Sequence, residues 1–169
     1  MAFQFDLETE LDEIFLDEAG THALDFALGY DLDDDKVIMM SVLLVSGESY
    51  LQGEVENLYD LQFGIRERFL SEDEHVTPPD FSTSSVEKYI PRQFRRAVFD
   101  VLLQAIKKLL AEANPSYLTM ETFYGSLPPK ALRKYEEIKN ALASCGYEQL
   151  DNFRDKETGI DYWLFRKSN

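Results

Sequence analysis

The segment Val37-Ile-Met-Met-Ser-Val-Leu-Leu-Val45 decides the fold class of this chain. It is a continuous run of aliphatic and β-branched residues, which is typical of a strand buried on both faces of a sheet. The preceding segment, Ala23–Tyr30, is also mostly apolar, and the polar residues Asp31–Lys36 lie between the two. The pattern predicts an antiparallel β-hairpin whose second strand is central in a sheet.

The C-terminal half alternates between helical and strand patterns. Apolar residues recur at helical spacing after Pro91, which suits a first helical turn because its missing N–H is not needed there. A second helical pattern opens at Pro128-Pro129 and closes at Gly146. The expected order is helix, strand, helix, strand, strand, over Arg92–Ala113, Tyr117–Phe123, Pro128–Gly146, Tyr147–Phe153 and Ile160–Lys167. We therefore expect an α/β (α+β) protein with a mixed, largely antiparallel central sheet flanked by helices.

Three other segments are less regular. Residues 1–20 favour a short acidic helix, in which Thr9 and Asp12 would form a capping box, or else an acidic arm. Residues 55–70 fit both the helical and the alternating period, and we expect a helix in the second half. Residues 71–85 indicate a loop, because they are polar and contain Pro78-Pro79. We expect residues 1–169 to form a single domain.

The net charge of −15 is spread unevenly along the chain. Residues 1–35 carry −12, residues 36–90 carry −6 and residues 91–169 carry +3. Phosphates would be repelled by the acidic N-terminal half, so we expect no direct binding to nucleic acid. The charge would suit a basic protein partner, or a solvated surface that keeps the chain soluble.

Cysteine and histidine are too few for a disulfide or a zinc site. Cys145 is the single cysteine, and His22 and His75 are the two histidines. We therefore predict no metal site of this kind. The first residues lack the basic and apolar regions of a secretory signal, and the longest apolar run is too short to span a bilayer. These features predict a protein of the reducing cytoplasm that has no membrane segment.

Three arginines crowd the predicted start of the first C-terminal helix. Arg92, Arg95 and Arg96 would lie where the helix dipole is positive, so each is disfavoured unless an anion is nearby. A phosphate or carboxylate ligand would supply that anion. Ion pairs with the acidic first 35 residues are the alternative, and the many carboxylates of the chain favour them.

The same region resembles the GNAT acyltransferase superfamily. Arg92-Gln-Phe-Arg95-Arg-Ala97 is similar to the family's pyrophosphate-binding signature Gln/Arg-x-x-Gly-x-Gly/Ala, with arginine at the middle glycine. Pro128-Pro-Lys-Ala131-Leu-Arg-Lys-Tyr135 resembles the family's Asn-x-x-Ala-x-x-x-Tyr pattern without its asparagine. Gly146-Tyr147 resembles the Gly-Phe that follows in the family. The resemblance covers residues 86–167.

The resemblance implies a CoA or acetyl-CoA cofactor and a set of site residues. Arg92, Arg95, Arg96 and Ala97 would bind the CoA pyrophosphate or another anion. Tyr135 would be the general acid, although its helical spacing also suits a core tyrosine. Glu121, on the predicted strand 117–123, is the candidate general base.

Three functions fit these observations. The first is a non-catalytic binding or regulatory protein of the inhibitor or immunity type, with a basic protein as its partner. The second is a CoA-dependent N-acyltransferase on the same GNAT-like scaffold. The third is a nucleic-acid mimic, whose carboxylates would have to be spaced like phosphates.

Overall fold

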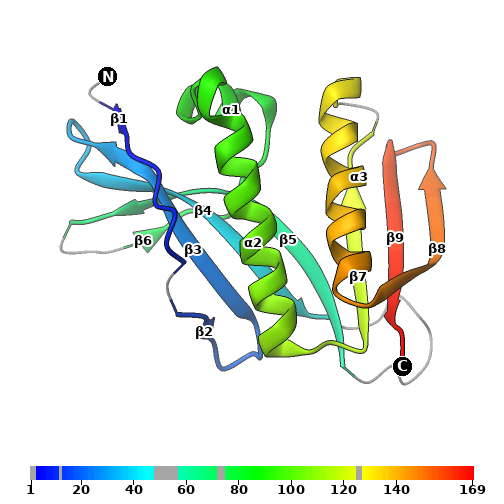
Figure 1. The fold of residues 1–169 in the computed structure, drawn as a ribbon. Coiled ribbons are helices and arrows are strands. Elements are labelled where there is room, and N and C mark those ends of the chain that lie inside the picture. The colour runs from blue at the N-terminus through cyan, green and yellow to red at the C-terminus, as the bar shows by residue number, and fades with distance from the viewer. Residues whose placement is uncertain (1–2, 12, 48–56, 72–74, 125–126) are drawn as a thin grey trace. The chain divides into compact units, whose positions relative to one another are not determined.

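The computed structural model describes residues 3–11, 13–47, 57–71, 75–124 and 127–169. It is a mixed α/β protein whose strands form a sheet flanked by helices (Figure 1). In chain order the elements are β1 (Phe3–Phe5), β2 (Phe15–Leu16), β3 (His22–Asp31), β4 (Lys36–Ser46), β5 (Leu58–Phe69), β6 (His75–Val76), α1 (Thr83–Tyr89), the 3-10 helix η1 (Arg92–Phe94), α2 (Arg95–Ala113), β7 (Tyr117–Thr122), α3 (Pro129–Ser144), β8 (Tyr147–Asp155) and β9 (Ile160–Lys167).

Hydrogen-bonded neighbours in the sheet follow the order β1-β3-β4-β5-β7-β9-β8, with β2 beside β3 and β6 beside β5. β5 and β7 are parallel, whereas the pairs β1/β3, β5/β6, β7/β9 and β8/β9 are antiparallel. The expected mixed, largely antiparallel sheet is therefore confirmed. None of the described helices is both long enough and apolar enough to cross a membrane.

The chain groups into two compact units. The first consists of residues 1–16, 23–43 and 63–106, and the second of residues 17–22, 44–62 and 107–169. The expectation of a single domain stays a prediction.

The core of the first unit is built on the β3–β4 hairpin. β4 is buried along nearly all of its length, as the run Val37–Val45 predicted. Phe26 of β3 and Ile38 and Met40 of β4 are almost completely buried, as are Leu102 and Ile106 of α2. Because both faces of β4 are covered, an uninterrupted apolar run is what this position requires.

The N-terminal segment forms strands where a helix was one expectation. β1 pairs with β3, so that Phe3 lies opposite Asp31, and the Phe3 ring contacts the Tyr89 ring edge-on at 5.3 Å between centroids. Among the described residues of 1–20, the regular elements are β1 and β2. The open edge of β3 offers backbone partners that an isolated acidic helix would lack. Asp12 of the expected capping box lies outside the described residues.

β5 corrects the expectation of a helix in the second half of residues 55–70. The segment is a strand from Leu58 to Phe69, and its alternating period was the relevant one. β5 has β4 on one side and β7 on the other, so both edges of its backbone are engaged at some point along its length. Sheet pairing of this kind overrides a weak local preference. Residues 71–85 also contain a short strand, β6, and the start of α1.

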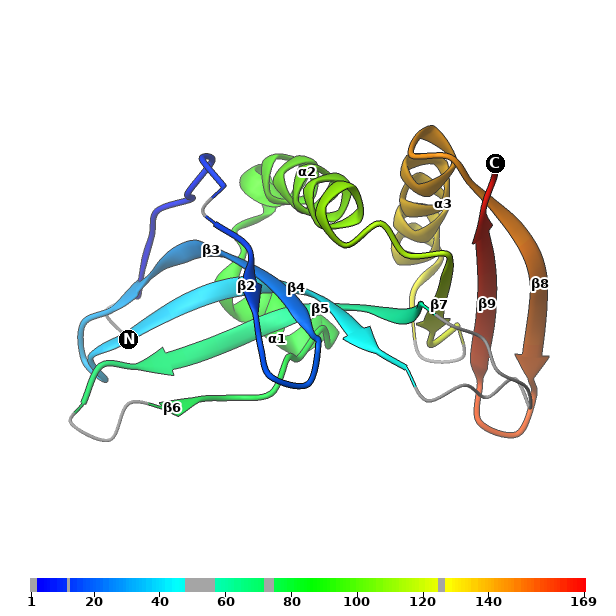
Figure 2. The same cartoon turned by 90° about the horizontal axis from the view of Figure 1, so that it is seen from below.

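The second unit follows the predicted order of its elements. α3 begins at Pro129 and is followed by Gly146 at φ 88°, a left-handed conformation that glycine adopts without a Cβ clash. Ile138 and Leu142 of α3 are buried, as are Leu118 and Met120 of β7. Figure 2 shows α3 on one side of β7, β9 and β8. The predicted strand, helix and hairpin of residues 117–167 are therefore confirmed.

Candidate functional site

The alternation of β7 divides its side chains between two faces of the sheet in the second unit. Leu118, Met120 and Thr122 are buried. The indole N–H of Trp163 donates to Thr122 Oγ1 at 3.1 Å, and Lys139 Nζ of α3 lies 4.0 Å from the Trp163 ring. These contacts show that Thr122 and Trp163 lie on the face of the sheet that is covered by α3. Thr119 and Glu121 point to the opposite face.

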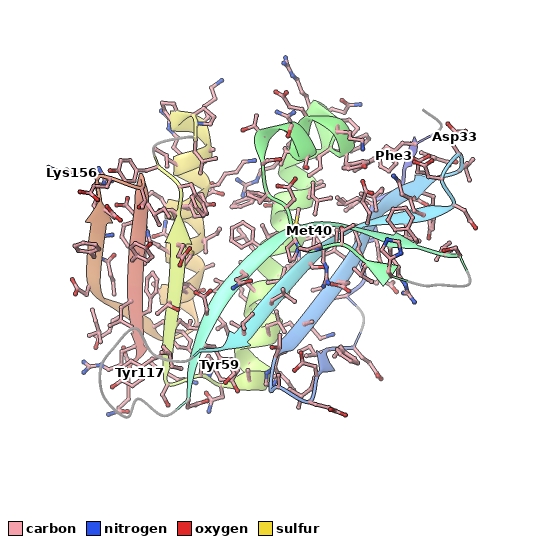
Figure 3. All side chains as sticks on the ribbon, turned by 180° about the vertical axis from the view of Figure 1, so that it is seen from behind. Phe3, Asp33, Met40, Tyr59, Tyr117 and Lys156 are labelled. Atoms are coloured by element: carbon pink, nitrogen blue, oxygen red, sulfur yellow. The ribbon has the colours of Figure 1, made fainter. Side chains whose placement is uncertain are left out.

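The register of neighbouring strands extends that opposite face into two rows of side chains. Directly paired residues project on the same side of a sheet. The first row, across β5, β7, β9 and β8, is Asp60, Thr119, Leu164 and Asp151. The second row, two residues farther along β7, β9 and β8, is Glu121, Tyr162 and Phe153. Figure 3 shows this unit from the side where the strands lie in front of α3.

A β-bulge in β8 selects which residues join these rows. Gln149 is paired with Phe165, but Asp151 is paired with the next residue, Leu164, so Leu150 is the extra residue. Without the bulge, Leu150 would lie opposite Leu164. The bulge therefore brings a carboxylate and, two residues later, the Phe153 ring onto this face.

The two rows surround a cavity of about 350 Å³. Its lining residues are Asp60, Thr119, Met120, Glu121, Asp151, Phe153, Tyr162, Trp163 and Leu164. Of these nine described residues, three are acidic and none is basic. Phe153 remains 63% exposed, and its ring lies 6.3 Å from that of Tyr162 between centroids. Carboxylates beside aromatic rings form a surface that attracts organic cations.

Asp60 is the most firmly held of the three carboxylates. Thr119 Oγ1 donates to one of its oxygens at 2.8 Å, and Gln62 Nε2 donates to the other at 2.8 Å. Burial and the nearby Asp60 charge raise the pKa of Glu121 above its ordinary value. A carboxylate with a raised pKa is a better proton acceptor than an ordinary surface glutamate, which is the property that a general base requires.

Tyr135 lies on the other side of the sheet from Glu121. It is on the same buried stripe of α3 as Ile138 and Leu142, and its side chain is 9% exposed. Burial raises the pKa of Tyr135 to about 12, so that its hydroxyl stays protonated at neutral pH. The structure therefore does not bring the two sequence-predicted catalytic candidates together in this cavity. The role of each stays a prediction.

The segment Arg92–Ala97 belongs to the first unit. The expected single helix begins instead as η1, and α2 starts at Arg95. Arg96 pairs with Asp100 of its own helix at 2.9 Å, and Arg95 Nε donates to the Ile90 carbonyl at 3.4 Å. The proposed ion pairs with residues 1–35 stay a prediction. The Phe5 ring of the N-terminal segment stacks on the Phe94 ring at 4.7 Å between centroids.

Two backbone N–H groups of this segment are bonded within the segment itself. The Phe94 N–H donates to the Pro91 carbonyl at 2.9 Å, and the Arg95 N–H donates to the Arg92 carbonyl. These N–H groups are therefore not directed at a ligand. The side chain of Arg92 is exposed and so accessible to a phosphate, and the role of Arg92, Arg95, Arg96 and Ala97 as an anion site stays a prediction.

Glu121 was named as a candidate from the sequence, whereas the acidic and aromatic cavity residues Asp60, Asp151, Phe153 and Tyr162 were not. Each is one of many acidic or aromatic residues in the chain. Their spacing was a usable signal. Polar or aromatic residues recur at every second position in three of the strands, which indicates that they share one face of the sheet. Which strands are neighbours, and in what register, could not be read from that spacing.

Comparison with known proteins finds similar solved structures but no similar family model or curated sequence. No protein-family model and no curated protein sequence matches the chain. Similar solved structures include a dodecameric spermidine N-acetyltransferase from Vibrio cholerae in an intermediate state, at 16% identity and TM-score 0.36, covering 88% of this chain and 64% of that one. A point mutant of the same enzyme, SpeG, has 13% identity and TM-score 0.38, covering 89% of this chain and 66% of that one.

This chain spans just under two thirds of the length of those structures. They are N-acetyltransferases, the class of enzyme that the resemblance in residues 86–167 implied. At these identities and TM-scores the likeness carries no argument about the chemistry of this chain.

Proposed function

We propose that this chain is an N-acyltransferase whose acceptor is a linear amine, with Glu121 as the general base. The observation that carries the proposal is the raised pKa of Glu121 in a cavity lined by carboxylates and aromatic rings. An alkylamine is an ammonium ion at neutral pH, because its pKa is about 10.4. It must lose a proton before its nitrogen can attack an acyl carbon. A neighbouring carboxylate attracts the ammonium ion and can accept that proton.

The arrangement of the carboxylates supports an acceptor with two positive charges. Asp60 and Glu121, on β5 and β7, form one acidic pole, and Asp151 on the edge strand β8 forms the other. Leu164 and Tyr162 of β9 lie between them. Neighbouring strands are about 4.8 Å apart, so the poles are separated by on the order of 10–14 Å. An extended aliphatic diamine or polyamine has this length, and its methylene groups would lie over the rings.

Acetyl-CoA would supply an activated acyl group, but in the segment Arg92–Ala97 the N–H groups of Phe94 and Arg95 are bonded to carbonyls of the chain itself. The residues of this chain act on the amine: Asp60 and Asp151 bind its charged ends, Tyr162 and Phe153 contact its chain, and Glu121 accepts its proton.

The engagement of the Phe94 and Arg95 N–H groups leaves fewer backbone donors for a pyrophosphate, which favours a second candidate function, that of a non-catalytic binding protein. A lysine or arginine side chain of a basic partner would enter the same cavity, and the net charge of −15 would favour such a partner. The two functions share a ligand chemistry and differ in whether an acyl group is transferred.

An acetyl-transfer assay with spermidine and acetyl-CoA separates these functions. The probe follows the substrate named for the structural neighbours. Mass spectrometry of the amine and the release of free thiol should both report transfer. Glu121→Gln should lower kcat/KM by about 10²–10⁴, the usual contribution of a general base. Glu157→Gln, a change in the β8–β9 turn outside the cavity, should leave it unchanged.

Calorimetry with spermidine alone completes the test. Binding without transfer would overturn the enzymatic proposal and leave the binding protein standing. If neither spermidine nor a lysine-rich peptide binds, the cavity is not a cation site and both functions fail.

A further inference from the structure

We infer that Thr119 determines which kind of cation the cavity accepts, by making the end of the cavity at Asp60 and Thr119 selective for a primary ammonium group over a fully methylated one. The inference rests on the proposed function, because the cation concerned is the amine. It goes further in assigning a specificity-determining residue and in naming the class of amine that this residue selects.

The hydrogen bond between Thr119 and Asp60 joins two strands. Asp60 of β5 lies directly opposite Thr119 of β7, and both residues line the cavity. The Thr119 hydroxyl donates to Asp60 Oδ1 at 2.8 Å. The direction of this bond is fixed, because a carboxylate has no proton to donate. The single hydroxyl proton of Thr119 is therefore committed to Asp60.

The Thr119 oxygen consequently faces a ligand as an acceptor. A hydroxyl oxygen carries two lone pairs in addition to its proton, and these lone pairs can receive an N–H group. With its proton held by Asp60, the hydroxyl has none to offer to a ligand in the cavity. Asp60 and Thr119 together therefore present acceptors without a donor.

The Asp60 carboxylate is held in place by a second donor. Gln62 Nε2, two residues farther along β5, donates to Asp60 Oδ2 at 2.8 Å. Gln62 is not among the described residues that line the cavity. Each Asp60 oxygen thus has a protein donor that fixes its orientation, and each keeps lone-pair capacity for a ligand. The acceptors are oriented before any ligand arrives.

An acceptor set of this kind distinguishes cations by their N–H groups. A primary ammonium group has three N–H donors, so it can give one to Asp60 and another to Thr119. A quaternary ammonium group has the same charge and no N–H. It keeps the attraction to the carboxylates and to the aromatic rings but forms neither hydrogen bond. Because the cavity is partly open to water, the difference should be about tenfold in affinity, the lower end of the range for hydrogen bonds to charged groups.

Calorimetry of the wild-type protein with two matched cations is the direct test. The probes are n-butylamine and n-butyltrimethylammonium, which both carry one positive charge at pH 7. The primary amine should bind about tenfold more tightly. Equal affinities would overturn the inference and leave an unselective cation site. If neither probe binds, the cation site itself fails, and the proposed function fails with it. No acyl donor is present, so the absence of acyl transfer would not affect this result.

Two substitutions of Thr119 assign the selectivity to its hydroxyl. Thr119→Val keeps the shape of the side chain and removes the hydroxyl, so the ratio of the two dissociation constants should fall toward one. Thr119→Ser retains the hydroxyl and should retain the ratio. An unchanged ratio in Thr119→Val would contradict the inference, because the size of the cavity would then select the ligand. The serine variant and the wild-type ratio keep the test open if the valine variant does not fold.

Gln62→Met is the matched control for the orientation of Asp60. Thr119→Val removes one of the two donors to Asp60 as well as the acceptor in the cavity, whereas Gln62→Met removes only the other donor. Gln62→Met should weaken both cations by a similar factor and leave their ratio close to that of the wild type. A ratio that falls as far as in Thr119→Val would overturn the inference, since the orientation of Asp60 would then be the cause.

Discussion

Glu67 and Glu121 are carboxylates on β-strands of the same chain, and their surroundings are opposite. Burial acts to raise the pKa of Glu67, but hydrogen bonds from Tyr89 and Lys36 and the charges of Lys36 and Lys88 outweigh it and hold the pKa below its ordinary value. For Glu121, burial and the Asp60 charge act together and raise the pKa.

Glu67 belongs to a polar network in which its carboxylate is paired with Lys36 and accepts a hydrogen bond from Tyr89. Lys36 is 6% exposed, and its Nζ lies 3.2 Å from Glu67 and 3.0 Å from Asp34. Tyr89 at the end of α1 donates its hydroxyl to Glu67, which fastens the helix to β5. Burial of Lys36 acts to lower its pKa, but hydrogen bonds to Asp34 and Glu67 outweigh that effect and raise it. Such a network stabilises the fold, because each of its buried polar groups has a partner.

Glu121 has no such compensating positive charge among the described residues that line its cavity. Two charges of the same sign share one face, and the register of β7, β8 and β9 adds Asp151 to them. An arrangement that disfavours its own charges is typical of a site that binds something of the opposite charge. The difference teaches that the partners of a carboxylate, rather than its burial alone, distinguish a structural group from a candidate functional one.

The largest expected effect is a loss of stability when the network of Lys36 and Glu67 is broken. Lys36→Met removes the buried cation and leaves Glu67 and Asp31 without it, so the free energy of unfolding should fall by about 3 kcal/mol. Urea denaturation measures this loss. The matched control is Lys130→Met, an exposed lysine near the start of α3, which should change stability by less than about 0.5 kcal/mol. Equal effects of the two substitutions would show that the Lys36 network contributes nothing.

A smaller effect is expected at the far pole of the cavity. Asp151 is exposed, so Asp151→Asn should weaken spermidine binding by about fivefold, the scale of an exposed ion pair. Binding of n-butylamine, which has one charge, should change little because the pair Asp60–Glu121 is intact. Glu157→Gln provides the control. If both amines lose affinity equally, Asp151 does not recognise a second charge.

The smallest effect is on stability, and it has opposite signs for the two glutamates. Because the folded pKa of Glu121 is raised, its ionisation costs stability as the pH rises through that pKa, and the cost persists above it. Glu121→Gln should therefore raise Tm at pH 7, on the order of 1–2 °C, and change it less at pH 4.

Glu67 should respond in the opposite direction, because its folded pKa is lowered. Its stabilising contribution is present above the ordinary glutamate pKa and is lost as the pH falls through the lowered value. Glu67→Gln should accordingly reduce Tm at pH 7. Thermal unfolding of both variants across pH 4–7 checks the contrast, and shifts of the same sign at pH 7 would contradict it.

Local pattern was sufficient where an element depends on its own residues. The run Val37–Val45 predicted a buried strand, and the apolar spacing between Pro128 and Gly146 predicted α3 with both of its ends. In these segments hydrophobic period, proline and glycine act within one element. Glu121 was also named from its strand, although its neighbours were not.

Pairing between distant segments was decided by the tertiary structure alone. Residues 55–70 satisfied two periods, and only the strands on either side made β5 a strand. Residues 3–5 became a strand because β3 offered a free edge. The cavity depends on three registers and one bulge, which bring together residues as far apart in the chain as Asp60 and Leu164. A period of two specifies which face a residue takes within its own strand, but the identity of its neighbours depends on which strand pairs with which.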